Sequence, residues 1–415
     1  MFLVVKHKKF LKMSKIILHI DLNQFFVRCE EIKNPSLIGK PVAVGGDGRR
    51  GIVSTCSYKA REYGIHSGMP MFQAKMLCKD LIITDVDFEY YELMSKEFID
   101  YVKKYTYKIE QMSIDECFCD ITEAYNKIGN GDILKFLKGF QVGLYKKTQL
   151  NCSIGVAPTK FLAKMGSDIK KPNGITIIRK RDIEKIIFPL PVKDFFGIGK
   201  KTAPRLEKIG FSTIGELYYG LKNDDIRLKD YFESGKDTII SQLEGNSSNE
   251  IYSSYGDPKS IGQTRTLNYD TNDAAVIKKF LEKMIDNVIN DFLKLNMLCK
   301  TIQITYKDAD CSKDFKTRTC SKSFSDYTND KKQIKNAGLE LFTETYDHTT
   351  IRLIGFTIKS LKAKHDVAVQ MTFENFEQHE KENKTQMIIN DLNRKAKKKI
   401  FFRLSDLTDK HYDEN

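Results

Sequence analysis

The feature that most constrains this fold is a pair of apolar strands that each run into carboxylates. Residues 15–20 form a short run rich in β-branched side chains that ends at Asp21. Residues 109–121 alternate between apolar and polar side chains around Asp115 and Glu116, which predicts a hairpin of two strands. Acids at the ends of buried strands are poorly solvated and repel one another, so such a site is stable when cations neutralise it. The sequence therefore indicates a sheet with a carboxylate site at one end.

Strand and helix patterns mix along the first half of the chain, which predicts an α+β fold class. We expect helices over 25–33, 58–63, 72–77, 90–105, 133–147 and 160–170, and further strands over 41–44, 52–54 and 152–156. From about Pro189 the pattern changes to short helices, and residues 245–258 are a nonperiodic linker candidate. Beyond it, residues 259–360 follow the order β-α-β-β-α-β, typical of a small two-layer domain.

Composition limits the class of protein. A chain of 415 residues is too long for a single hydrophobic core, so we expect several domains. No apolar run approaches the roughly 20 residues of a membrane span, so we expect no membrane association and a cytoplasmic location. The nine cysteines are odd in number and contain no Cys-x-x-Cys pair, which argues against disulfides and zinc. The net charge of +13 indicates a polyanionic partner such as nucleic acid.

The carboxylates suggest a particular metal. Oxygen ligands without His or Cys favour Mg²⁺, and two such ions can catalyse transfer at a phosphate. The alternative is that Asp21 only caps the helix beginning near Phe25, while Asp115 and Glu116 occupy a solvated turn. The spacing alone leaves both interpretations open.

Several motifs, in register from about residue 16 to residue 356, resemble the Y-family (translesion) DNA polymerases, in particular the bacterial DNA polymerase IV (DinB-like) branch. They are Asp21-Leu22-Asn23-Gln24-Phe25-Phe26, Arg50-Gly51-Ile52-Val53-Ser54-Thr55, Tyr58-Lys59-Ala60-Arg61-Glu62-Tyr63-Gly64, Ser67-Gly68-Met69-Pro70, Ser113-Ile114-Asp115-Glu116, Ser153-Ile154-Gly155-Val156-Ala157 and Lys171-Pro172-Asn173-Gly174. The chain departs from the usual pattern at Gln24, where an aromatic or Cys is common, and at Cys117 and Phe118. These departures bear on packing near the metals.

The resemblance implies roles for individual residues. Asp21, Asp115 and Glu116 would be catalytic and bind two Mg²⁺ ions, with the backbone carbonyl of Leu22 as a further ligand. Phe26 would be the steric gate that excludes a ribose 2′-hydroxyl, although a core phenylalanine on an amphipathic helix is the alternative. The nucleotide would be bound by the amides of Phe25 and Phe26 and by Thr55, Tyr58, Arg61 and Lys171.

The resemblance also implies the domains of a right hand. Residues 1–14 would be an N-terminal extension, 15–188 the palm and fingers (fingers about 25–86), 189–244 a thumb with a helix-hairpin-helix, 245–258 a linker, 259–360 the little finger and 361–415 a charged tail. DNA contacts are expected at Gly197, Gly199, Lys200, Lys259, Ser260, Arg265 and Lys307. In the tail, Gln370, Met371 and Phe373 resemble a clamp-binding peptide, with a plain tail strand as the alternative.

The implied activity is template-directed addition of deoxynucleotides to a primer 3′ end, at low fidelity, across lesions and without proofreading. The implied partners are primer-template DNA, a deoxynucleoside triphosphate and a sliding clamp, bound by a monomer. One rival is a catalytically silent scaffold that binds DNA and a clamp, and the intact carboxylate set argues against it. A second rival is a nucleotide cyclase, which the helix-hairpin-helix and the second DNA-facing domain disfavour.

Overall fold

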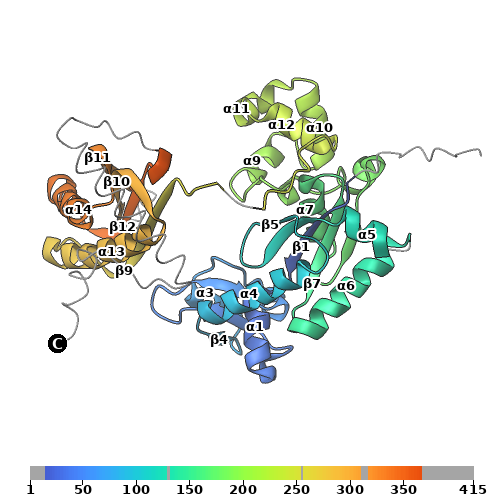
Figure 1. Cartoon of the computed structure of the whole chain (residues 1–415), viewed down its shortest axis with the longest axis horizontal. Coiled ribbons are helices and arrows are strands. Elements are labelled where there is room, and N and C mark those ends of the chain that lie inside the picture. Colours follow the sequence, from blue (N-terminus) through green and yellow to red (C-terminus); the bar gives the residue numbers. More distant parts are fainter. Residues whose placement is uncertain (1–14, 129–130, 254–255, 310–315, 367–415) are drawn as a thin grey trace, which may run out of the picture. The chain divides into compact units, whose positions relative to one another are not determined.

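A computed structural model describes residues 15–128, 131–253, 256–309 and 316–366. The chain divides into two compact units, Met1–Gly256 and Asp257–Asn415 (Figure 1). The division falls within the segment expected to be a linker. The expected N-terminal extension and the clamp motif at 370–373 lie outside the described residues.

The first unit is built on a five-stranded sheet. Its strands lie in the order β5 (Ile109–Gln111), β6 (Glu116–Asp120), β1 (Ile17–Leu22), β7 (Cys152–Ala157) and β8 (Ile175–Ile177). Strand β1 is central and runs antiparallel to both β6 and β7, whereas β7 and β8 are parallel. The predicted strands at 15–20, 109–121 and 152–156 are therefore confirmed. Strand β8 was not predicted.

Strand alternation gives the main sheet two different faces. The helices on it are α4 (Phe88–Val102), α6 (Ile133–Thr148) and α7 (Lys160–Ile169). Leu18 and Ile20 belong to the core shared with α4 and α6, whereas Ile17 belongs to the core shared with α7. Because side chains two apart share a face, His19 and Asp21 lie on the same face as Ile17, under α7. The side chain of Asp21 therefore faces α7.

A second, three-stranded sheet follows β1 in the chain. Its order is β3 (Val53–Cys56), β2 (Val42–Gly45) and β4 (Ile82–Thr84). The helices nearby are α1 (Phe25–Lys33), α2 (Tyr58–Arg61) and α3 (Met71–Leu77). A small core of its own, which includes Val53, Cys56, Ala60 and Met71, joins β3, α2 and α3. The expected helices are confirmed, and the short β4 was not predicted.

The rest of the first unit is helical. Its helices are α5 (Thr122–Ile128), α8 (Ile183–Ile186), α9 (Ala203–Lys208), α10 (Ile214–Lys222), α11 (Lys229–Phe232) and α12 (Lys236–Leu243) (Figure 1). The segment after α12 is tied to the main sheet: the backbone N–H of Tyr252 donates to Glu110 Oε2 at 3.0 Å, and Lys160 Nζ lies 2.9 Å from the same oxygen. Part of the expected linker is thus anchored on this unit.

The second unit has the predicted β-α-β-β-α-β order. Its elements are β9 (Ser260–Thr271), α13 (Ala274–Lys294), β10 (Met297–Asp308), β11 (Thr317–Thr328), α14 (Lys331–Thr345) and β12 (Ile351–Lys359), followed by the short β13 (Lys362–Ala363). The sheet order is β11-β10-β12-β9, and β13 pairs with β10. One core, which includes Leu281, Phe292, Ile304 and Phe356, lies between the two helices and one face of the sheet. Among the described residues, no helix combines the length and apolar character needed to cross a membrane.

Candidate active site

The three carboxylates singled out from the sequence meet at one end of the main sheet. The pairing of β1 with β6 places Asp21 opposite Glu116. Asp115, in the turn before β6, accepts a hydrogen bond on its backbone carbonyl from the N–H of Leu22 at 2.9 Å. Antiparallel pairing therefore joins acids that are far apart in the sequence.

Asp115 shows the electrostatic state of this site. Burial raises the pKa of its carboxyl, the nearby charges of Asp21 and Glu116 add to that effect, and a hydrogen bond from the Ser113 hydroxyl opposes it. That bond is 2.6 Å long and holds the carboxylate in place. A half-buried acid whose pKa is raised by burial and by neighbouring negative charges is short of positive charge. A bound cation would supply that charge.

Lys164 on α7, which the sequence analysis did not single out, supplies part of this charge. Its Nζ lies 2.9 Å from Glu116 Oε2, 3.3 Å from Asp21 Oδ2 and 3.6 Å from Asp168 Oδ2. Lys171 Nζ lies 2.8 Å from Asp21 Oδ2. Burial acts against both ammonium charges, but the carboxylates outweigh it and raise the pKa of both lysines. In the sequence, the charged residues at 164, 168 and 171 are three or four positions apart, a spacing that could have indicated this cluster.

His19 is a second residue that sequence reasoning missed. It is 0% exposed, and its Nδ1 lies 2.8 Å from Ser167 Oγ. Its Nε2 lies 3.3 Å from Glu116 Oε2, although no described atom meets it with good hydrogen-bond geometry. The distance is the more informative of the two observations, because a small rotation of the ring would align the N–H. Burial lowers the pKa of His19, so the imidazole is neutral.

This imidazole belongs to the carboxylate cluster. His19, Asp21 and Glu116 offer ligand atoms that lie within 4.8 Å of one another. The contact with His19 and the charge of Lys164 lower the pKa of Glu116 to about 2, although burial acts in the opposite direction. Glu116 is therefore ionised at neutral pH. The cluster could hold a metal ion, and the expectation of a purely carboxylate surrounding was incomplete.

The alternative that Asp21 merely caps α1 is wrong. The residue at the N-cap is Gln24, in the left-handed region with φ 41° and ψ 49°, and it makes no side-chain capping bond. Asp21 instead contacts Lys164 and Lys171. Its carboxylate is committed to the site under α7.

A cavity of about 290 Å³ joins the carboxylates to the residues expected to bind a nucleotide. The side chains of Tyr58 and Arg61 lie together there, with the guanidinium 4.9 Å from the ring centroid. Burial raises the pKa of Tyr58, which keeps its hydroxyl a hydrogen-bond donor. The lining residues are Asp21, Leu22, Gln24, Phe25, Phe26, Ser54, Thr55, Tyr58, Arg61, Ser67, Asp115 and Lys171.

Phe26 is held rigidly at the wall of this cavity. Its ring stacks on Tyr91 with centroids 4.4 Å apart and an interplanar angle of 13°. It also makes an edge contact with the ring of Phe88, with centroids 6.0 Å apart. Such aromatic contacts favour a defined geometry. The ring thus has both the packing of a core residue and a place in the cavity lining.

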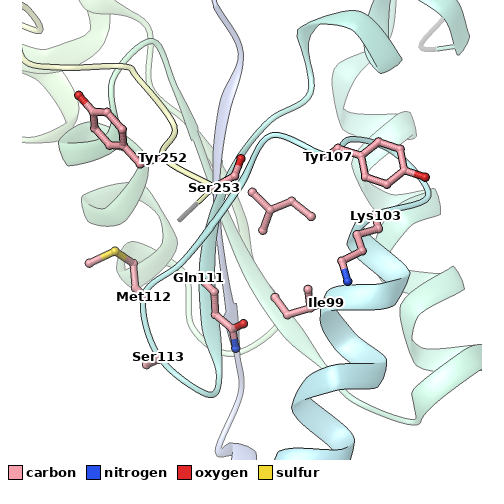
Figure 2. A pocket seen from close by; sticks show the side chains of 9 residues that line it. Ile99, Lys103, Tyr107, Gln111, Met112, Ser113, Tyr252 and Ser253 are labelled. Atoms are coloured by element: carbon pink, nitrogen blue, oxygen red, sulfur yellow. The ribbon is translucent and has the colours of Figure 1, made fainter. Parts of the chain in front are cut away.

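A second cavity, of about 630 Å³, lies elsewhere in the first unit. Figure 2 shows Ile99 and Lys103 on a helix at one side, with Met112 and Tyr252 on the opposite side. Its lining contains no carboxylate and none of the residues predicted to act in catalysis. Two of the candidate metal ligands, Asp21 and Asp115, line the smaller cavity instead.

The residues expected to contact DNA lie at several places. Gly197 has φ 110°, a conformation that favours glycine, in the turn before α9. In the second unit, Ser260 pairs with Lys359 and Arg265 pairs with Ile354, whose side chain is in the core. Ser260 and Arg265 therefore lie on opposite faces of the sheet. They would not contact one flat surface together.

Comparisons with known proteins agree with this geometry. The family model described as the impB/mucB/samB family matches residues 20–168, and that of its C-terminal domain matches residues 258–373. A model of the family's HHH motif matches residues 180–211. The chain therefore belongs to this family, the Y-family DNA polymerases, and the resemblance noted from the motifs is confirmed.

Relatives and solved structures narrow the class. The chain is 35% identical over 385 residues to DNA polymerase IV of Oceanobacillus iheyensis, covering 92% of this chain and 89% of that protein. It is 36% identical over 387 residues to DNA polymerase IV of Bacillus anthracis, covering 92% of each. A Y-family DNA polymerase chimera of Dbh and Dpo4 matches with a TM-score of 0.73 and 25% identity, over 84% of this chain and 100% of that chain. An insertion ternary complex of Dbh DNA polymerase matches with a TM-score of 0.58 and 26% identity, over the same shares.

These likenesses define the enzyme class. The chain is a DNA-directed DNA polymerase of the DNA polymerase IV branch. The predicted α+β right-hand fold is confirmed.

Proposed function

We propose that this enzyme adds deoxynucleotides to a primer 3′ end opposite a template, including damaged template bases, by two-metal-ion phosphoryl transfer and without proofreading. The observation that carries the proposal is the shared cavity. Asp21 and Asp115 line the same space as Tyr58, Arg61 and Lys171. Metal ligands and cations suited to a triphosphate therefore face one reacting centre.

The metal ligands in this proposal are the carboxylates of Asp21, Asp115 and Glu116 and the carbonyl of Leu22. The raised pKa of Asp115, caused first by burial, fits a site that is completed by cations. Two Mg²⁺ ions, when bound, would activate the primer hydroxyl and stabilise the leaving pyrophosphate. Ser113 holds Asp115 by a 2.6 Å hydrogen bond. Preorganised ligands of this kind lower the cost of assembling the reacting groups.

The nucleotide is proposed to bind along the cations of the cavity. Arg61 offers a fork of donors to phosphate oxygens, and Lys171 offers a point charge beside Asp21. Thr55 and Tyr58 add hydroxyls, while the amides of Phe25 and Phe26 begin α1. The ring of Phe26, fixed by Tyr91, would exclude a ribose 2′-hydroxyl.

We assign the parts of the hand accordingly. Residues 15–188 would be the palm and fingers, 189–244 the thumb and 259–360 the little finger. DNA phosphates would be contacted at Gly197, Gly199 and Lys200 of the thumb. In the little finger they would be contacted at Lys259 and at either Ser260 or Arg265, because the last two lie on opposite faces of the sheet. The clamp contact at 370–373, the monomeric state and the cytoplasmic location stay predictions from the sequence.

Primer extension tests the proposal. Wild-type protein with Mg²⁺ should extend a primer on an undamaged template and past a damaged template base. Asp115→Asn should reduce extension by about 10²-fold or more. Asp85→Asn, which changes an exposed acid, should not. DNA binding by wild type without extension would instead identify a silent scaffold.

A further inference from the structure

Gln24 occupies a demanding position between β1 and α1. Its backbone is left-handed, with φ 41° and ψ 49°, a region that side chains other than glycine, asparagine and aspartate adopt rarely. It is also the residue at which the sequence departs from the pattern usual in the family. A rare conformation persists where surrounding contacts fix it. The Gln24 side chain makes contacts of this kind.

The Gln24 amide joins two parts of the first unit. Its Oε1 accepts a hydrogen bond from the backbone N–H of Tyr58 at 2.8 Å, at the start of α2. Its Nε2 donates to Glu31 Oε1 at 3.0 Å, on α1. The side chain therefore bridges the helix that carries Tyr58 and Arg61 to the helix that carries Phe26.

The bridge continues into a buried ion pair. Arg28 Nη1 donates to Glu31 Oε2 at 3.0 Å, and Arg28 Nε donates to the carbonyl of Gln149 at 2.8 Å. Arg28 and Glu31 are only 8% and 5% exposed. A salt bridge held on both sides by further hydrogen bonds is a rigid anchor. Through Gln24, the Tyr58 amide is therefore held in place relative to this ion pair on α1.

The amide of Gln24 satisfies both ends of this bridge. The Tyr58 N–H can only donate, and the Glu31 carboxylate can only accept, so residue 24 must offer an acceptor and a donor at the same time. A carboxylate at position 24 would meet Glu31 with like charge. An apolar side chain would leave the Tyr58 N–H without this acceptor and Glu31 Oε1 without this donor.

We propose that Gln24 is a positioning residue that fixes α2, and with it Tyr58 and Arg61, for the triphosphate of the incoming nucleotide. This inference rests on the proposed function, because the nucleotide site is itself proposed. Gln24 acts through the backbone of Tyr58. Its loss should therefore weaken nucleotide binding more than it slows the chemical step.

Steady-state primer extension with varied nucleotide concentration tests this inference. Gln24→Leu should raise KM for the nucleotide about 10-fold, the effect of losing a hydrogen bond to a charged group, with kcat changed less than about 3-fold. Gln24→Glu should do the same, because it repels Glu31. Gln73→Leu, an exposed glutamine on α3, is the matched control and should leave both constants unchanged.

A rescue separates positioning from general damage. In the double variant Gln24→Glu with Glu31→Gln, the new amide at 31 can donate to the carboxylate at 24, so KM should fall back at least about 3-fold relative to Gln24→Glu alone. If Gln24→Leu fails to fold, Gln24→Glu and the double variant decide. The inference is wrong if wild type extends primers but KM is unchanged in the Gln24 variants, if only kcat falls, or if the double variant shows no rescue. Absence of extension by wild type would instead remove the proposed function.

Discussion

Replacing Lys164 with methionine tests whether an internal cation holds the carboxylate site together without metal. The substitution keeps the methylene chain and removes the ammonium. That ammonium lies 2.9 Å from Glu116, 3.3 Å from Asp21 and 3.6 Å from Asp168. Without it, Lys171, 2.8 Å from Asp21, still neutralises part of the site. The variant should therefore be less stable than wild type when divalent ions are absent.

The size of the effect follows from the surroundings. Removing one partner of a buried ion pair costs about 3–5 kcal/mol. The effect here should be smaller, because Asp168 is 47% exposed and Lys171 remains. We expect a loss of about 2 kcal/mol, which corresponds to a fall in Tm of roughly 4–8 °C. Lys170→Met, at an exposed neighbouring position, should change Tm little.

Calorimetry of the full chain in EDTA and in excess Mg²⁺ measures this effect. A bound divalent ion replaces the missing charge in the variant, so Mg²⁺ should raise its Tm more than that of wild type. An unchanged Tm in EDTA would refute the view that Lys164 is the internal counter-charge. A rise with Mg²⁺ no larger than in wild type would refute the link to the metal site.

Three further predictions follow from the described contacts. Phe26→Ala should raise ribonucleotide incorporation about 10-fold or more in primer extension, and unchanged sugar selectivity would reject the gate. Lys160→Met leaves the carboxylate of Glu110, 7% exposed, without its ammonium partner; it should lower the free energy of unfolding in urea by about 2 kcal/mol, and an unchanged midpoint would contradict this. Burial raises the pKa of both Cys29 and Cys299 from 9.0 to about 12. Neither thiol should react with a disulfide reagent at pH 8 in the folded protein, and rapid labelling of the native protein would contradict this. The stability that the neutral thiols give is complete below pH 9 and should be lost as the pH rises from 9 to 12.

Much of this fold could be predicted because its signals are local. The β-α-β-β-α-β order over 259–360 was expected and is the order that the structure shows, since its strands and helices are long enough for their periods to appear. The hairpin around Asp115 was equally visible. In contrast, β4 and β8 have three residues each, too few for a period to appear.

Only the part of the site that depends on strand pairing and on sequence motifs could be predicted. Asp21 and Glu116 meet because their strands pair, and a sequence can indicate that. His19 shares the face of Asp21 by strand alternation, which the sequence could have shown. Lys164 joins them only because α7 packs on that face of the sheet, which depends on tertiary contacts. The role of Gln24 depends on a left-handed backbone that its residue type does not favour. Alternation along β9 could have shown that Ser260 and Arg265 face opposite sides.

The central claim is that Asp21, Asp115 and Glu116 hold two metal ions beside a bound nucleotide. Electron paramagnetic resonance of Mn²⁺, which substitutes for Mg²⁺ at oxygen ligands, counts these ions directly in the protein bound to primer-template DNA and a non-hydrolysable deoxynucleoside triphosphate. We expect about two bound ions per complex in wild type, in line with a two-metal site, and fewer in Asp115→Asn under the same conditions. An equal count in both proteins would contradict the account.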